Sequence, residues 1–390
     1  MQFTGKPLAA MAVVVIFAAF GFSSPLSSTK KTSFSTQQKE PRKIQVAILL
    51  DVSGSMQGLI EQAKAQLWNM VTTLGKTRCT DKSAPQIELA LYEYGRSSND
   101  VAKGYVKQLS PFTTDLDQVS KILFSLSTNG GDEYCGQVIY TSLDELNWNP
   151  SPDNYKVIFI AGNEDFLQGK LNYTTSCTKA KEKGVIVNTI YCGDYQTGIA
   201  EHWNLGGECG NGSFTHINHN AREADIPTPY DSMLIVLNGK LNKTYIGYGA
   251  LGFANTTRQE EVDQMNFSVN KSVAAKRINA KAQKNVYNNA SWDLVDATTA
   301  DSTYITKVDI KTLPDTLKNK SREQLRQIVS EKANERNFIQ KEIATVSISR
   351  DKFIALEKAK TVSGNNQQTL ETEVEKIIKE QVKRYKMVIE

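Results

Sequence analysis

The feature that most constrains the fold of this chain is a regular alternation of short apolar runs with longer segments of helical spacing. The apolar runs are nearly continuous, rich in β-branched residues and bounded by turn residues, which is typical of strands buried on both faces. They are residues 44–50, 87–94, 155–161, 185–191 and, more weakly, 213–217. Such strands alternating with helices predict a parallel sheet with helices on both of its faces.

The segments between these runs carry apolar residues three and four positions apart, the spacing of an amphipathic helix. The clearest is 56–74, and the others are 115–126, 136–148, 171–183, 198–205 and 223–237. We therefore predict an α/β fold with a doubly wound, mostly parallel sheet flanked by helices. In such sheets, ligands bind beyond the carboxyl ends of the strands.

The first apolar run ends in Asp51-Val-Ser53-Gly-Ser55, and the first helix follows at once. One carboxylate and two hydroxyls at alternating positions can converge on one point, and hard oxygen ligands suit Mg²⁺, Mn²⁺ or Ca²⁺. Three side chains do not fill six coordination positions, so waters and a partner's carboxylate can complete the shell. The simpler interpretation is an Asx-turn with a helix cap. Capping needs one such residue, whereas this loop has three.

This Asp51-x-Ser53-x-Ser55 motif resembles the first part of the metal ion-dependent adhesion site (MIDAS) of the von Willebrand factor type A (vWA) family. The resemblance covers residues 43–240 and implies a vWA, Rossmann-like fold and metal-dependent binding of another protein. Family members also contribute a Thr or an Asp from a second loop with paired glycines. Thr128-Asn-Gly-Gly-Asp132-Glu133 matches that loop. The resemblance therefore implies a metal site made of Asp51, Ser53, Ser55 and Asp132.

The third loop of the family usually reads Thr-Asp-Gly, and this chain departs from it. Residues 158–165 read Ile-Phe-Ile-Ala-Gly-Asn-Glu-Asp, with Gly162 where the family's Asp would align. Three residues that follow could reach an ion directly or through water: Asn163, Glu164 and Asp165. With Asp51 and Asp132, two carboxylates still face the cation, enough to balance a divalent charge. We therefore expect Mg²⁺, or else Mn²⁺ or Ca²⁺, at this site.

The chain opens with a segment typical of an export signal. Residues 1–24 contain Lys6 and then an almost wholly apolar run from Leu8 to Phe22, long enough for a signal peptide and short for a membrane span. An uncleaved N-terminal anchor is the alternative, and membrane contact is expected only through it. Residues 25–42 are predicted to be a flexible linker. Both interpretations place the folded part outside the cytoplasm, as a periplasmic, cell-surface or secreted protein.

Strand signals fade after residue 240. Residues 241–310 are predicted to be a linker and helical docking segment, and residues 311–390 a helical tail. The apolar residues of its last helix form a narrow stripe suited to a helical hairpin or coiled coil. These are Leu370, Val374, Ile377, Ile378, Val382 and Tyr385. The tail also holds 17 Lys or Arg against 12 Asp or Glu, in alternation, which accounts for the net charge of +4. Such alternation is typical of a solvated helix surface, so no nucleic-acid partner is expected.

The cysteine count is odd, so at least one of the five stays free or pairs outside the chain. In an exported protein some should be paired, and their spacing leaves the connectivity open. The sequence lacks a Gly-x-Ser-x-Gly elbow, a HExxH helix and a phosphate-binding glycine loop. We therefore do not expect an enzyme.

The leading hypothesis is an exported, metal-dependent protein-binding module, for adhesion or assembly, that recognises an acidic side chain on a protein partner. One alternative is a metal-free structural or assembly protein of the envelope, in which the altered third loop has lost the metal. A less favoured alternative is a metal-dependent hydrolase, in which the cation would activate water. That reaction needs a base near the metal, and the sequence shows no recognisable one.

Overall fold

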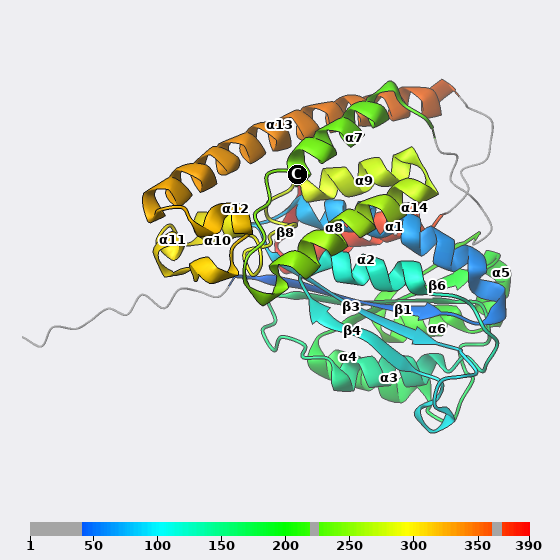
Figure 1. The fold of residues 1–390 in the computed structure, drawn as a ribbon. Helices are drawn as coiled ribbons and strands as arrows, with labels where there is room; N and C mark the ends of the chain where they lie inside the picture. The colour runs from blue at the N-terminus through cyan, green and yellow to red at the C-terminus, as the bar shows by residue number, and fades with distance from the viewer. Residues whose placement is uncertain (1–40, 219–225, 361–368) are drawn as a thin grey trace, which may run out of the picture. The chain divides into compact units, whose positions relative to one another are not determined.

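A six-stranded sheet lies at the centre of the fold in the computed structural model, which describes residues 41–218, 226–360 and 369–390 (Figure 1). In spatial order the strands are β4 (Lys107–Thr113), β3 (Gln86–Tyr94), β1 (Lys43–Asp51), β5 (Tyr155–Gly162), β6 (Ile186–Cys192) and β7 (Asn211–Ile217). Neighbouring strands are parallel except for β3 and β4. The five predicted strands are present, and the mostly parallel sheet is confirmed.

The inner strands are apolar because they are buried on both faces. β1 pairs with β3 on one side and with β5 on the other, and every residue of β5 and β6 is buried. β4 was not predicted from the sequence. It is a half-exposed strand at the edge of the sheet that contains Pro111, so it lacks the continuous apolar character of the others.

Helices cover both faces of the sheet, which confirms the doubly wound arrangement. They are α1 (Gln57–Gly75) and α2 (Leu116–Ser125) on one face, and α3 (Cys135–Glu145), α4 (Tyr173–Lys183) and α6 (Trp203–Cys209) on the other. The short α5 (Tyr195–Ala200) follows β6. Successive side chains of β1 enter opposite cores: Val46 and Leu50 pack with the first group of helices, Ala47 and Leu49 with the second.

The segment after β7 forms a further group of helices. They are α7 (Pro229–Asn242), α8 (Gly249–Val269), α9 (Lys271–Lys281), α10 (Leu294–Ala300), α11 (Tyr304–Lys307), α12 (Asp315–Lys318) and α13 (Arg322–Lys360). α9 packs on α1, α8 packs on α2 and α9, and the 39-residue α13 runs along α7 (Figure 1). The boundary predicted at residue 240 falls inside α7, and Pro41–Glu390 forms one compact unit.

The C-terminal end of the chain returns to the sheet. α14 (Leu370–Gln381) lies against α1 and β7, and β8 (Met387–Ile389) pairs antiparallel with β2 (Thr77–Cys79). The apolar residues of this last helix, among them Val374, Ile377 and Ile378, join the core between the sheet and α1. The stripe that suggested a hairpin or coiled coil is therefore used within the chain.

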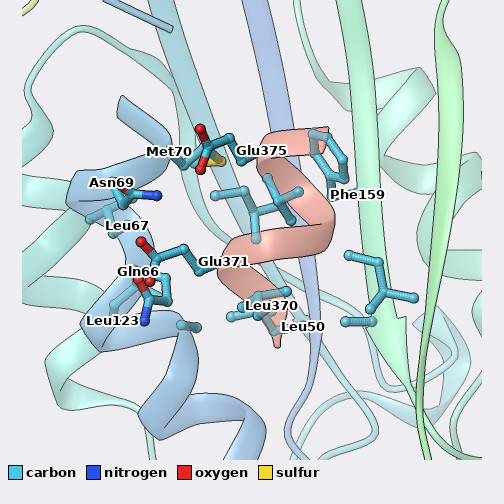
Figure 2. A pocket seen from close by; sticks show the side chains of 15 residues that line it. Leu50, Gln66, Leu67, Asn69, Met70, Leu123, Phe159, Leu370, Glu371 and Glu375 are labelled. Atoms are coloured by element: carbon cyan, nitrogen blue, oxygen red, sulfur yellow. The ribbon is translucent and has the colours of Figure 1, made fainter. Parts of the chain in front are cut away.

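A small apolar cavity remains beneath α14 (Figure 2). Its volume is about 50 Å³, and its walls include Leu50 of β1, Phe159 of β5 and Leu370 of α14. Glu371 and Glu375 of α14 line it from the same helix. Packing around α14 is therefore close but not complete.

The cysteines divide into one pair and three single residues. Cys177 of α4 and Cys209 of α6 form a disulfide. Cys79, Cys135 and Cys192 are free and buried. The mixture of paired and free cysteines expected from their odd number is present.

The predicted export segment, residues 1–24, and residues 25–40 of the predicted linker lie outside the described residues. None of the helices in residues 41–218, 226–360 and 369–390 has both the length and the apolar character needed to cross a membrane.

Candidate metal site

Asp51 is the last residue of β1 and lies at the carboxyl ends of the parallel strands. Hydrogen bonds within the loop that follows hold its shape. The Ser53 amide donates to Asp51 Oδ1 at 2.7 Å, and the hydroxyls of Ser53 and Ser55 lie 3.3 Å apart. Asp51 is fully buried, Ser53 is nearly so and Ser55 is exposed. The motif therefore forms a line of oxygens that runs from the core to the surface.

The second loop lies beside the first. The Asn129 amide donates to the Val52 carbonyl at 2.8 Å, and the Ser97 amide donates to the Gly130 carbonyl at 2.7 Å. These bonds bring a carboxylate to Asp51, but it is that of Glu133, which is 7% exposed. The Asp132 side chain is exposed and accepts a hydrogen bond from the Tyr134 hydroxyl at 3.1 Å.

Gly95 explains how two carboxylates come so close. It follows β3 with a φ of +79°, and a Cβ there would lie 2.9 Å from Asp51 Oδ1 and 3.0 Å from Glu133 Cγ. A residue with a side chain would meet both a strained backbone and this contact. Glycine at this position therefore leaves room for Asp51 and Glu133 on neighbouring loops.

The departure in the third loop also has a local cause. A Cβ on Gly162 would lie 2.5 Å from the Tyr94 hydroxyl and 3.0 Å from Asp51 Oδ2. The Tyr94 hydroxyl is fixed there because it donates to the Ala161 carbonyl at 2.9 Å. Tyr94 thus fills the space that a side chain at position 162 would need. The next residue, Asn163, accepts a hydrogen bond from Ser55 Oγ at 3.1 Å.

The carboxylates at this edge repel one another. Burial raises the pKa of Asp51 to about 6, and the charge of Glu164 adds to the rise. Burial also raises the pKa of Glu133 to about 8, with contributions from the charges of Asp51 and Glu164. Arg96, next to Gly95, is engaged with Glu93 at 3.0 Å and with the Ser127 carbonyl. The loop cluster is therefore an acidic centre.

The donor set fits a hard divalent cation. Asp51 Oδ2 is buried and has no hydrogen-bond partner among the described residues, an arrangement that costs free energy unless the oxygen has another ligand. A cation there would offset both the cost of the buried oxygen without a partner and the repulsion between the carboxylates. No three His, Cys, Asp or Glu side chains in the described part of the chain group closely enough to hold a metal by themselves. The serine oxygens and waters would have to take part.

Of the four predicted ligands, the structure brings Asp51, Ser53 and Ser55 together. Asp132 lies on the adjacent loop with its carboxylate turned to Tyr134, and its role as a ligand stays a prediction. Sequence reasoning did not single out Glu133. Spacing alone cannot tell which of two consecutive carboxylates turns inward, since the loop backbone decides it. The signal that could have pointed to Glu133 is its position just before the buried start of α3.

The order of the strands, the helices on both faces and the place of the Asp51 loop at the end of β1 are those expected of a vWA-type fold. The resemblance suggested by the sequence is thus confirmed for the fold. No family model and no curated protein matches the sequence.

Among solved structures, the chain is similar to an aerotolerance-related membrane protein from Bacteroides fragilis, with 16% identity and a TM-score of 0.31, over 45% of this chain and 93% of that one. It is also similar to the SpRpn10 VWA domain, with 14% identity and a TM-score of 0.33, over 45% and 88% of the two chains. A third is proximal thread matrix protein 1 from the mussel byssus, with a zinc-occupied MIDAS motif, at 13% identity and a TM-score of 0.32. That match covers 45% of this chain and 42% of the mussel protein.

Proposed function

We propose that this chain is an exported protein-binding module for adhesion or assembly, and that it grips its partner through a divalent cation held at the Asp51 loop. Mg²⁺ is the preferred ion, with Mn²⁺ and Ca²⁺ as alternatives, because the available ligands are oxygens. The disulfide between Cys177 and Cys209 supports export, since such bonds persist in oxidising compartments.

The observation that carries the proposal is that Asp51 Oδ2, buried in a centre of crowded carboxylates, has no hydrogen-bond partner among the residues that the structure describes. The other oxygen, Oδ1, has a donor in the Ser53 amide, and a buried carboxylate oxygen normally has a donor or a basic partner. A centre arranged in this way is poised for a cation.

Each loop would have its own part in holding the ion. Asp51 and Glu133 would supply negative charge, and the Ser53 and Ser55 hydroxyls would supply neutral oxygens. Asn163, through its bond to Ser55, orients the exposed hydroxyl. A bound cation would supply a positive centre to which a partner's oxygen can bind.

The partner group that fits such a centre is an acidic side chain on another protein. Ser55 is exposed, so the outer side of the loop is open to a ligand. A carboxylate from the partner would complete a shell that the chain's own side chains leave unfilled.

Metal-dependent capture of a partner from an extract of the source cells tests this function. Immobilised wild-type chain should retain a partner with Mg²⁺ present and release it when a chelator is added. Asp51→Asn should fail to retain it in either condition, because the main anionic ligand is lost.

Asp153→Asn is the matched control. Asp153 is an exposed residue just before β5, at the opposite edge of the sheet, and should leave capture unchanged. Retention that persists in chelator and in Asp51→Asn would instead support the metal-free assembly protein.

A further inference from the structure

A short turn, residues 201–203, leads from α5 into the first residue of α6 and contacts the third loop. The Phe166 amide donates to the Glu201 carbonyl at 2.9 Å, and the Trp203 indole N–H donates to the Glu164 carbonyl at 2.8 Å. His202 Nδ1 lies 3.0 Å from Asp165 Oδ1. The loop that presents Asn163 to Ser55 is therefore hydrogen-bonded to this turn at three successive residues.

Trp203 is the best fixed member of the turn. It is fully buried, and its ring packs edge-on against Phe166 at 5.2 Å and Tyr191 at 5.9 Å. Its own carbonyl accepts a hydrogen bond from the Thr189 hydroxyl at 2.7 Å. With the backbone and ring both held, the indole N–H points in one direction.

The helix that carries Trp203 is itself braced. α6 packs against β6 and β7, and its last residue, Cys209, is bonded to Cys177 of α4. The contacts of Trp203 thus rest on a rigid element, whereas Asn163 and Glu164 belong to a loop without regular structure. Rigid elements position a site more accurately than the loop could alone.

We propose that Trp203 is a positioning residue for the third loop of the metal site. Its indole N–H fixes the Glu164 carbonyl, which holds Asn163 against Ser55 and keeps the Glu164 side chain at the acidic centre. This inference rests on the proposed metal function and goes beyond it, because Trp203 lies outside the DxSxS, second-loop and third-loop segments.

Trp203→Phe tests the proposal because it keeps an aromatic ring and removes the N–H together with part of the indole, and Trp148→Phe makes the same chemical change elsewhere. In calorimetric titrations with Mg²⁺ or Mn²⁺ alone, Trp203→Phe should bind the ion about threefold to tenfold more weakly than the wild type, the loss expected for one hydrogen bond. Hydrogen exchange of the metal-free chain should show faster exchange of the amides in residues 163–167.

Trp148→Phe is the matched control. Its indole N–H also donates to a backbone carbonyl, that of Ser142, at 3.1 Å, and its ring packs against Phe112. It lies after α3, away from the Asp51 loop, so it should change neither metal affinity nor exchange in residues 163–167.

The two readouts separate this inference from the proposed function. Exchange in residues 163–167 that is the same in Trp203→Phe and in the wild type would overturn the positioning role, whatever the metal result. Faster exchange together with a wild-type metal affinity would also overturn it. Absence of metal binding by the wild-type chain would overturn the proposed function and, with it, this role.

Discussion

At the scale of single residues, the site depends on how closely side chains approach Asp51. Tyr94, Gly95, Glu133 and Gly162 are all in its immediate surroundings. Two of these are glycines at positions where a Cβ would collide with the others. The chemistry of the loop is therefore decided as much by the space left free as by the oxygens present.

Gly162→Ala should destabilise the fold by about 1 to 3 kcal/mol, the usual cost of overpacking a core. The reason is the 2.5 Å approach of the new Cβ to the Tyr94 hydroxyl. Adding Tyr94→Phe should recover part of the loss in urea unfolding. Gly239→Ala, in α7 with no atom within 4 Å of its new Cβ, is the control and should be neutral or stabilising. Equal losses from both glycines would show that crowding at Tyr94 is not the cause.

The acidic centre should make the metal-free chain less stable as pH rises. The pKa of Asp51 rises from 3.8 to about 6 on folding, and that of Glu133 from 4.5 to about 8. The folded state then binds more protons than the unfolded state between pH 4 and pH 8, so stability is present at low pH and lost across that window.

Thermal unfolding from pH 5 to pH 9 in chelator measures this effect. The midpoint of the wild-type chain should fall by several degrees, and that of Glu133→Gln should fall less. If the unfolding temperature of the wild-type chain rose from pH 5 to pH 9, the charge repulsion described for the acidic centre would be contradicted.

At the scale of elements, a buried ion cluster ties the helices after β7 to the sheet domain. Arg277 of α9 bonds Asp117 of α2 at 2.7 Å and Asp263 of α8 at 2.5 Å, and Lys281 bonds Asp263 at 2.9 Å. Arg277 is 1% exposed and Lys281 is fully buried. Buried ion pairs therefore join these three helices. Removing one charge would leave its partner buried without compensation.

Arg277→Met should destabilise the chain by about 3 to 5 kcal/mol, because it leaves the buried Asp117 carboxylate without its cationic partner and removes one of the two cations beside Asp263. Lys121→Met breaks an ion pair with Glu261 whose two side chains are 47% and 45% exposed. That control should cost less than about 1 kcal/mol. Similar costs for the two variants in urea unfolding would mean that the Arg277 cluster is not a tie between elements.

The sequence predicted elements well where burial left a clear pattern. The runs that became β1, β5 and β6 are buried on both faces, so their apolar character is nearly unbroken. The sequence did not predict β4, because all its residues except the buried Ser110 are exposed or half-buried and no apolar run marks the strand. The stripe of α14 was found, but a stripe does not say what it packs on. The partner turned out to be α1 and the sheet.

For the site, the sequence predicted the Asp51, Ser53 and Ser55 loop because their spacing is local. It could not predict the inward turn of Glu133, nor the blocking of position 162 by Tyr94. The first depends on the backbone of the second loop, and the second depends on Tyr94 of β3, which meets position 162 only in the folded chain.

At the scale of the whole molecule, the sheet domain and the C-terminal helices share one core. Ile378 of α14 is fully buried with residues of α1 and the sheet. The Gln381 side chain accepts hydrogen bonds from Tyr155 of β5 and Asn188 of β6. Deleting residues 311–390 would expose this core, so such a deletion cannot separate a tail function from folding.

Point substitutions can test this shared core. Ile378→Ala should cost about 2 to 5 kcal/mol in a single cooperative unfolding transition of the whole chain. Ile348→Ala, on α13 with 56% exposure, should cost less than about 0.5 kcal/mol. If Ile378→Ala instead split unfolding into two separate transitions, α14 would not be part of the core of the sheet domain.

Binding of a divalent cation at the Asp51 loop is tested most directly by calorimetric titration of the purified full-length chain with Mg²⁺ and Mn²⁺. We expect one ion per chain for the wild type and for Asp153→Asn, and an affinity at least about tenfold weaker for Asp51→Asn, since a coordinating charge is lost. Circular dichroism would confirm that Asp51→Asn remains folded. Unchanged affinity in Asp51→Asn, or no ion bound by the wild type, would contradict the metal-dependent site.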